Sequence, residues 1–299
     1  MMERGHRSFE AGDAVAPRPG GGSGGGSGSV FLLTDYGFTD ELAGVLRAVV
    51  ARAAPGAPLV DLTHGVPAFD VRAGALALMR AVPYLGPGVV IAVVDPGVAT
   101  GSRRAVALEV ASRAGPRFLV GPDNGLLVWA AEALGGVVSA VDLGSAPERS
   151  TFDGRDLFGP VAAEIWRGAR LSDLGNPIDA GTLVRLEAPV LSVAPGVIET
   201  EVLWVDTFGN VQLAATPADA GRAQVGDQVS EDLDVIAGGT RTVALRVEAF
   251  AGVRSGGLGL LVDANGHLAL VGDRSSAART LGLGAGDPVK LVSRGRGDG

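Results

Sequence analysis

Acidic and basic side chains follow an apolar run in the first third of the chain. The run Val89–Val94 ends in Asp95 and a Pro-Gly pair, and Arg103 and Arg104 come after a short turn. This pattern predicts a buried strand that delivers Asp95 to the edge of a sheet, and a turn that carries the arginines back toward it. In open α/β sheets, ligands bind outside the carboxyl ends of the strands. Asp95 is therefore the predicted centre of the chemistry.

Two earlier apolar runs also end in polar residues. Val30–Leu33 ends in Thr34 and Asp35, and a carboxylate there can accept two hydrogen bonds from a vicinal diol such as a ribose. An Asx turn is the alternative for Asp35. No glycine-rich phosphate loop follows, so we expect no phosphate-anchored nucleotide, while a nucleoside stays open. The second run, Pro58–Leu62, is followed by His64. His64 could act at the same edge of the sheet, or it could form only a structural hydrogen bond to a neighbouring backbone group. Phe69 could face a ligand or pack in the core.

Three later motifs combine polar residues with turns. Residues 121–125 read Gly-Pro-Asp-Asn-Gly, and our preferred interpretation is that the Asp or Asn caps the next helix. Residues 150–160 place several polar groups before an apolar helix. Residues 204–210 put Phe208 between Asp206 and Asn210, which suits stacking and edge hydrogen bonds to a planar heterocycle. A surface β-turn explains that last motif nearly as well.

Composition excludes several classes of function. The formal net charge of −8 argues against a general nucleic-acid binder, and the absence of cysteine excludes disulfides, thiolate metal sites and a cysteine nucleophile. Only three histidines occur, and no two of them share a short motif. We therefore expect no metal and no cofactor. No apolar run has the length of a membrane span and no secretory signal is visible, so we expect a cytoplasmic protein without membrane partners.

The chain divides by composition into four parts. Residues 1–29 form a Gly/Ser-rich tail that cannot bury a core. In residues 30–168, apolar strands alternate with helical patterns such as 40–51, 71–82, 125–134 and 156–166, which predicts a Rossmann-like α/β domain with a mostly parallel central sheet. Residues 169–189 are a predicted connector. Residues 190–299 carry short β-rich runs, which predict a smaller antiparallel sandwich or barrel.

The ordered set of six motifs identifies a protein family far more specifically than any single motif does. They read TDYGFTDE, VDLTHGVP, VVDPGVATGSRRAV, VGPDNG, STFDGRDLFGP and VDTFGNV. This set resembles the S-adenosylmethionine hydroxide adenosyltransferases, which hydrolyse S-adenosylmethionine to adenosine and methionine and are related to the fluorinase and chlorinase. The resemblance covers about residues 30–292.

The resemblance implies a homotrimer whose sites lie between one subunit's N-terminal domain and its neighbour's C-terminal domain. Asp35 would hold the ribose diol. Asp40, together with Asp206 of the neighbouring chain, would meet the methionine portion. The adenine would lie among aromatic and amide side chains, namely Phe208 and Asn210, with Phe69 and Phe250 as further walls.

The resemblance also implies an Asp–Arg–His set around the attacking water. Asp95 matches the aspartate, and Arg103 matches the arginine, with one extra residue in the turn between them. The family histidine is replaced by Asp153, which lies between Phe152 and Gly154, two further substrate-binding positions. Because the fluorinase has a serine at the position of Gly154, fluoride binding is not indicated. The halogenases lack the aspartate, which favours water as the nucleophile.

The activity implied is hydrolysis of the C5′–S bond of S-adenosylmethionine. We interpret Asp153 as a replacement acceptor that helps orient the water, because Asp95 and Arg103 are both present. The alternative is a catalytically weakened protein that binds S-adenosylmethionine or adenosine without turnover.

Overall fold

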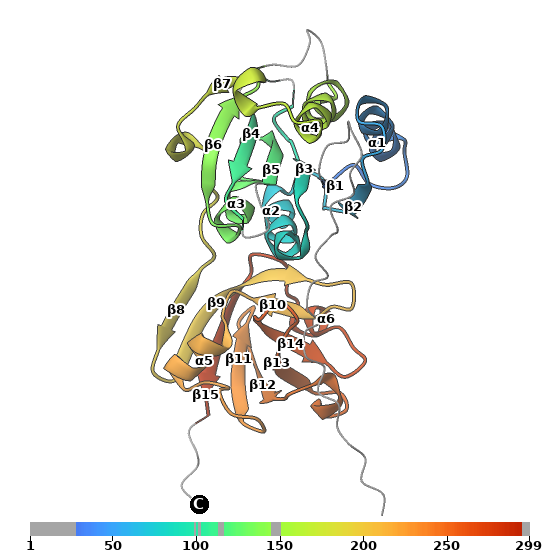
Figure 1. Cartoon of the computed structure of the whole chain (residues 1–299). Helices are drawn as coiled ribbons and strands as arrows, with labels where there is room; N and C mark the ends of the chain where they lie inside the picture. Colours follow the sequence, from blue (N-terminus) through green and yellow to red (C-terminus); the bar gives the residue numbers. More distant parts are fainter. Residues whose placement is uncertain (1–27, 99, 101–102, 113–116, 145–150, 295–299) are drawn as a thin grey trace, which may run out of the picture.

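The computed structural model describes residues 28–98, 100, 103–112, 117–144 and 151–294 of the 299-residue chain. The predicted tail, except for residues 28 and 29, lies outside the described residues, as do positions 99, 101 and 102 of the turn after Asp95. Figure 1 shows an α/β part stacked on a β part, as predicted for the fold class. The exact bounds of the domains remain a proposal.

The α/β part is built on a seven-stranded mixed sheet. Strands β2, β1, β3 and β5 are mutually parallel, and β4 is antiparallel to both of its neighbours. Because β5 and β6 are each antiparallel to β4, they point the same way, so five of the seven strands share one direction. In spatial order the strands are β2 (Leu59–Thr63), β1 (Ser29–Thr34), β3 (Gly88–Val93), β5 (Arg117–Pro122), β4 (Ala105–Val110), β6 (Val137–Asp142) and β7 (Asn176–Pro177).

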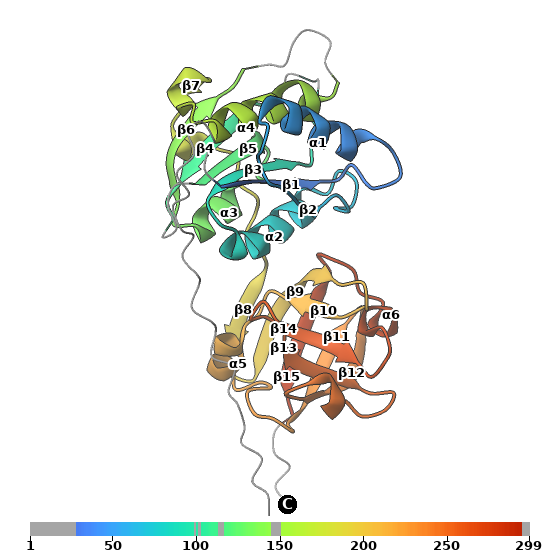
Figure 2. The same ribbon diagram turned by 45° about the vertical axis from the view of Figure 1, so that its right-hand side comes forward.

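Helices cover both faces of this sheet (Figure 2). Alternate side chains of a strand point to opposite faces, so Val30 and Leu32 pack with α1 (Leu42–Ala53) and α4 (Gly159–Trp166). Phe31 and Leu33 pack in the other layer, with the helices α2 (Val71–Ala81) and α3 (Val128–Ala133). Double-sided burial accounts for the continuous apolar strands seen in the sequence.

The strand order reverses between β1 and β3. From β1 the chain crosses to β2 on one side and then to β3 on the other. Asp35 follows β1 and Asp95 lies two residues beyond β3, so both carboxylates lie where the neighbouring strand ends diverge. This position is the usual ligand crevice of open α/β sheets.

The predicted helix over 156–166 differs from the observed one. A π-helical turn (Gly154–Phe158) precedes α4, and Asp153 immediately precedes that turn. Such widened turns are rare and occur frequently at functional sites. The predicted helix over 40–51 instead begins at Leu42, so Asp40 lies in the preceding loop.

The β part is a closed barrel, one of the two predicted forms. Seven strands follow each other around it, and β10 closes it by pairing with β9, while β8 adds to the outside of β9. Pairings are antiparallel apart from β12 with β13. The strands are β8 (Leu191–Ala194), β9 (Val197–Val205), β10 (Val211–Leu213), β11 (Asp232–Ala237), β12 (Thr240–Arg246), β13 (Leu258–Val262), β14 (Leu268–Gly272) and β15 (Pro288–Ser293). Two short helices that the sequence did not predict, α5 (Pro217–Ala223) and α6 (Ala277–Leu281), accompany them.

Helix α2 faces the barrel (Figure 2) and carries much of the contact between the two parts. Leu76 packs with Leu203 and Ala214, and Arg80 donates to Gln212 Oε1 at 2.8 Å. In the predicted connector, β7 pairs with β6, so this segment runs along the α/β sheet. None of the helices in the described part of the chain has the length and apolar character needed to span a bilayer.

Candidate active site

Asp95, Arg103 and Asp153 form one ion-paired group. Arg103 Nε donates to Asp95 Oδ2 at 2.9 Å, and Arg103 Nη2 donates to both Asp95 Oδ2 and Asp153 Oδ2. Their side chains are 5%, 12% and 8% exposed for Asp95, Arg103 and Asp153, so the group is largely desolvated. The structure thus brings together three residues that lie up to 58 positions apart in the chain.

The guanidinium holds this group together. Burial opposes the charge of Arg103, but hydrogen bonds and attraction from Asp95 and Asp153 outweigh it and raise the pKa of Arg103, which stays protonated. The ring of Phe158 lies 5.6 Å from the guanidinium carbon and supports it from one side. Two carboxylates and one guanidinium give the group a formal charge of −1, which suits a cationic ligand.

The π-helical turn places Asp153 and shapes the wall beside it. A Cβ atom at Gly154 would strike the hydroxyl oxygen of Tyr36, so a larger residue there requires Tyr36 to move. Phe152 packs edge-on against Tyr36, with ring centroids 5.3 Å apart. The predicted positions Phe152 and Gly154 therefore lie beside the ion-paired group, and Tyr36 joins them.

Asp35 lies on the same edge and bonds to a strained residue. Its Oδ2 accepts from the backbone N–H of Phe69 at 2.9 Å. Phe69 has φ of 67°, a left-handed conformation that is costly for a bulky side chain, and the residue is 70% exposed. The core alternative for Phe69 is therefore wrong. Strain of this kind clusters at ligand sites, and here it presents an aromatic ring beside Asp35.

The strand end that carries Asp35 is fixed by buried polar groups. Thr34 Oγ1 lies 2.8 Å from Nδ1 of His64 and accepts from the backbone N–H of Tyr36 at 3.2 Å. His64 is 1% exposed, and its Nε2 lies 3.2 Å from Asp61 Oδ1. The contact of His64 with Thr34 is therefore structural, and it helps to hold the turn that follows β1.

The motif at 121–125 supports the loop of Asp95 and does not cap a helix. Our capping interpretation is wrong, because α3 begins at Val128 with Leu127 as its N-cap. Asn124 Nδ2 instead donates to the carbonyl of Val94 at 2.8 Å. Asp123 accepts from Arg104 at 2.6 and 2.8 Å and from the backbone N–H of Val184 at 2.8 Å. The residues on both sides of the Asp95–Arg103 pair are therefore tied to the sheet edge.

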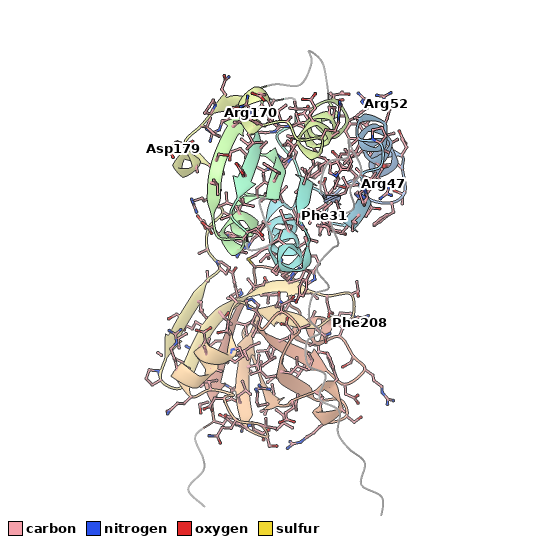
Figure 3. The ribbon with its side chains drawn as sticks, in the orientation of Figure 1. Phe31, Arg47, Arg52, Arg170, Asp179 and Phe208 are labelled. Carbon is pink, nitrogen blue, oxygen red and sulfur yellow. The ribbon has the colours of Figure 1, made fainter. Side chains whose placement is uncertain are left out.

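The remaining predicted residues gather on the barrel. Asp206 Oδ1 accepts from the backbone N–H groups of Phe208 and Asn210 at 2.9 and 2.8 Å, and its Oδ2 accepts from Asn210 Nδ2 at 2.7 Å. This is the turn that the sequence left as an alternative, and it presents Phe208 with 78% of its surface exposed (Figure 3). Phe250 is 54% exposed.

Two adjoining cavities lie between these side chains. One of about 580 Å³ is lined by Asp206, Asn210 and Phe250, and a second of about 490 Å³ by Phe208, Asn210 and Phe250. Neither cavity is lined by Asp35, Asp95, Arg103 or Asp153. The predicted site residues thus form two groups within one chain.

Asp40 stands apart from both groups. It is exposed in the loop before α1, and its Oδ1 accepts from the backbone N–H of Leu42 at 3.3 Å. Sequence reasoning missed Tyr36 and Asn124 as members of the site. The position of Tyr36 directly after Asp35 was the available signal for it. No cluster of three or more potential metal ligands occurs among the residues that the structure describes.

Proteins of known sequence and structure resemble this chain along most of its length. A protein of Salinispora tropica named (R)-S-adenosyl-L-methionine hydrolase is 43% identical over 269 residues, which cover 88% of this chain and 97% of that protein. A Thermus thermophilus protein of the same name is 38% identical over a match that covers 88% of this chain and 99% of that protein. The crystal structure of an uncharacterized conserved protein from Thermotoga maritima matches with a TM-score of 0.79 at 30% identity, covering 88% and 99%.

Two family models match in the order of the two structural parts. The SAM hydroxide adenosyltransferase N-terminal domain matches residues 30–175, and the C-terminal domain of the same family matches residues 200–290. The resemblance inferred from six motifs is thereby confirmed. The chain belongs to the SAM hydroxide adenosyltransferase family.

Proposed function

We propose that this protein hydrolyses the C5′–S bond of S-adenosylmethionine and releases adenosine and L-methionine. The observation that carries the proposal is the buried Asp95–Arg103–Asp153 group at the switch point of the sheet. Relatives that are 38–43% identical bear the name of this hydrolase, which disfavours the catalytically weakened alternative.

The reaction needs positioning more than acid catalysis. A water oxygen attacks C5′ in line with the sulfonium, and the C5′–S electron pair leaves with sulfur as the neutral thioether of methionine. Holding the water in line can supply several kcal/mol of the barrier, as an order-of-magnitude estimate. Asp95 orients the water and accepts its proton as attack proceeds, since a carboxylate is a weak base near neutral pH.

Asp153 acts beside Asp95 in place of the family histidine. Arg103 binds both carboxylates through one nitrogen, so two acceptor groups converge on the same region. A water between them can donate one hydrogen to each. The formal charge of −1 also attracts the sulfonium in a site with little water to screen it.

Recognition of the nucleoside falls to the other predicted residues. We assign Asp35 to the ribose diol. The N–H of Phe69 donates to its Oδ2, so its Oδ1 can accept from a ribose hydroxyl. Phe208 and Phe250 offer exposed rings to the adenine, and Asn210 lines both barrel cavities. Asp40 and Asp206 are assigned to the methionine portion, with Phe69 as a further wall.

We propose a homotrimer in which the barrel of one chain completes the site of its neighbour. The separation of the two residue groups within one chain supports this arrangement. Co-expression of Asp95→Asn and Phe208→Ala chains tests it. If sites are shared, about a quarter of randomly assembled sites are intact and activity returns to that level. If each chain holds its own site, the activity of the mixture, assayed at substrate concentrations well below KM where both variants are impaired, stays at the average of its two parents. A cytoplasmic location remains part of the proposal and is checked by cell fractionation.

The decisive experiment for the activity uses isotopic water. The purified protein is incubated with each sulfur epimer of S-adenosylmethionine in H₂¹⁸O, and the products are separated and weighed by mass spectrometry. We expect methionine and adenosine with ¹⁸O at the 5′ oxygen. Binding of S-adenosylmethionine without adenosine above a buffer control would identify the weakened binding protein instead. A 5′-chloro product in chloride buffer would identify a halogenase.

A further inference from the structure

We infer that the hydroxyl of Tyr36 donates a hydrogen bond to the attacking water and supplies the neutral donor that the chain lost when Asp153 took the place of the family histidine. The inference rests on the proposed function. It assigns a catalytic residue that is not part of the Asp95–Arg103–Asp153 group, and it explains how that group works with two carboxylates.

The hydroxyl of Tyr36 lies at the site itself. Its oxygen would be 2.2 Å from a Cβ atom placed on Gly154, so it lies directly over the residue that follows Asp153. The backbone N–H of Tyr36 is held by Thr34 Oγ1, and its ring packs edge-on against Phe152. These contacts fix the ring while leaving the hydroxyl at the wall of the site.

The hydroxyl is protonated and has a hydrogen to give. Burial, followed by the charges of Asp35, Asp95 and Asp153, raises the pKa of Tyr36 far above its ordinary value, and the opposing effect of Arg103 is smaller. A phenol in this field is a donor at any working pH. Among the side chains that the structure describes, Tyr36 Oη has no hydrogen-bond partner, so this donor is available for a ligand or water.

The hydrogen bonds of the water then become complete. A water oxygen has two hydrogens and two lone pairs. Asp95 and Asp153 accept the hydrogens, and one lone pair must point at C5′. With only carboxylates around it the water could rotate about that pair of bonds, whereas a donor on the second lone pair fixes its orientation. Arg103 directs Nε and Nη2 to the carboxylates and is charged, so Tyr36 is the neutral donor among these four side chains.

The bond changes balance without consuming the tyrosine proton. The water oxygen bonds to C5′, the C5′–S pair leaves as methionine, and the proton of the new oxonium passes to Asp95 and then to solvent. Tyr36 keeps its proton throughout and moves its hydrogen bond to the 5′ oxygen of adenosine.

A double-mutant cycle tests the inference. Tyr36→Phe should lower kcat about tenfold, as expected for one neutral hydrogen bond, with KM and the adenosine Kd within about twofold. In an Asp153→His background the histidine restores the donor, so Tyr36→Phe should cost less than about twofold. Tyr84→Phe is the matched control, because Tyr84 is the other of the two tyrosines and is 80% exposed. An equal loss in both backgrounds, or no loss with Asp153 present, would overturn the inference.

A second readout does not depend on turnover. In the Tyr84→Phe protein, Tyr36 is the sole tyrosine, and its ionisation can be followed by ultraviolet absorbance. We expect ionisation well above the ordinary value of about 10, and Asp153→Asn should lower it. A pKa of Tyr36 near the ordinary value would show that its hydroxyl does not lie beside the carboxylates, and it would refute the inference. If the wild type forms no adenosine while this titration behaves as expected, the proposed function fails and the placement of the hydroxyl stands.

Discussion

The strand-end group of the α/β part and the aromatic turn of the barrel are organised in opposite ways. In the first, Asp95, Arg103 and Asp153 are buried and satisfy one another by internal ion pairs. In the second, Asp206 uses both of its oxygens to fix its own turn, and Phe208 is left exposed. Charges are costly to bury and must be placed before the ligand arrives. An exposed ring gains its contacts only when something covers it. This contrast supports the proposal that the first group performs the chemistry and the second recognises the ligand.

Loss of the central carboxylate should give the largest effect. Asp95→Asn keeps the shape of the side chain but cannot accept a proton, so we expect kcat to fall about 10²- to 10⁴-fold. Adenosine affinity, measured by calorimetry, should change little. Asp173→Asn is a suitable control, since that carboxylate forms an exposed pair with Arg170. A wild-type rate in Asp95→Asn would remove Asp95 from the mechanism.

Loss of an exposed ring should affect binding instead of kcat. Stacking of a base on an aromatic side chain contributes about 1–3 kcal/mol, so Phe208→Ala should weaken adenosine binding by roughly 5- to 150-fold. Thermal stability should be unchanged, because Phe208 is 78% exposed. Tyr84→Ala is the matched control, because Tyr84 lies on the α/β part and is 80% exposed; it should leave affinity unchanged. A fall in kcat at unchanged affinity in Phe208→Ala would break the division between the two regions.

Sequence reasoning placed Asp35 and Asp95 at strand ends, as the structure has them, and missed the residues that support them. Asp35 and Asp95 could be predicted because an apolar run that ends in a carboxylate marks a strand end, and strand ends converge. The role of Asn124 could not, because its bond to the carbonyl of Val94 joins positions 30 residues apart. A helix cap and such a tertiary bond use the same residue types.

Periodicity also has a limit at the start of α4. The apolar pattern over 156–166 predicts a helix, but it does not distinguish α-helical from π-helical spacing at 154–158. Asp153, which binds Arg103, directly precedes that widened turn, and the backbone of Gly154 at its start lies against Tyr36 and Phe152. The barrel was predicted from its short β-rich runs, one of two forms that such runs are compatible with.

Substitution of Gly154 should separate packing from charge within the strand-end group. A methyl group there would meet the hydroxyl of Tyr36, so Gly154→Ala should lower stability by about 1–3 kcal/mol, measured by urea unfolding. Adding Tyr36→Phe removes the oxygen that the methyl would strike, and part of the stability should return. An additive loss in the double variant would show that the two residues do not meet.

The smallest expected effect tests whether a buried charge of the barrel is only structural. Asp219 in α5 accepts from the hydroxyl and N–H of Thr216 and pairs with Arg222. Burial alone would raise the pKa of Asp219, but these bonds outweigh it and lower the pKa. A depressed pKa stabilises the fold above the unfolded value of about 3.9, and that contribution disappears as pH falls through the folded value.

Asp219→Asn should therefore cost about 0.5–1 kcal/mol at pH 7 and progressively less below about pH 4, followed by denaturant unfolding across that range. Its kcat and adenosine affinity should equal those of the wild type, because α5 carries none of the residues assigned to the site. A change in either kinetic constant would mean that the charges of the barrel take part in the chemistry. The proposed division between a reactive α/β part and a ligand-recognising β part would then be wrong.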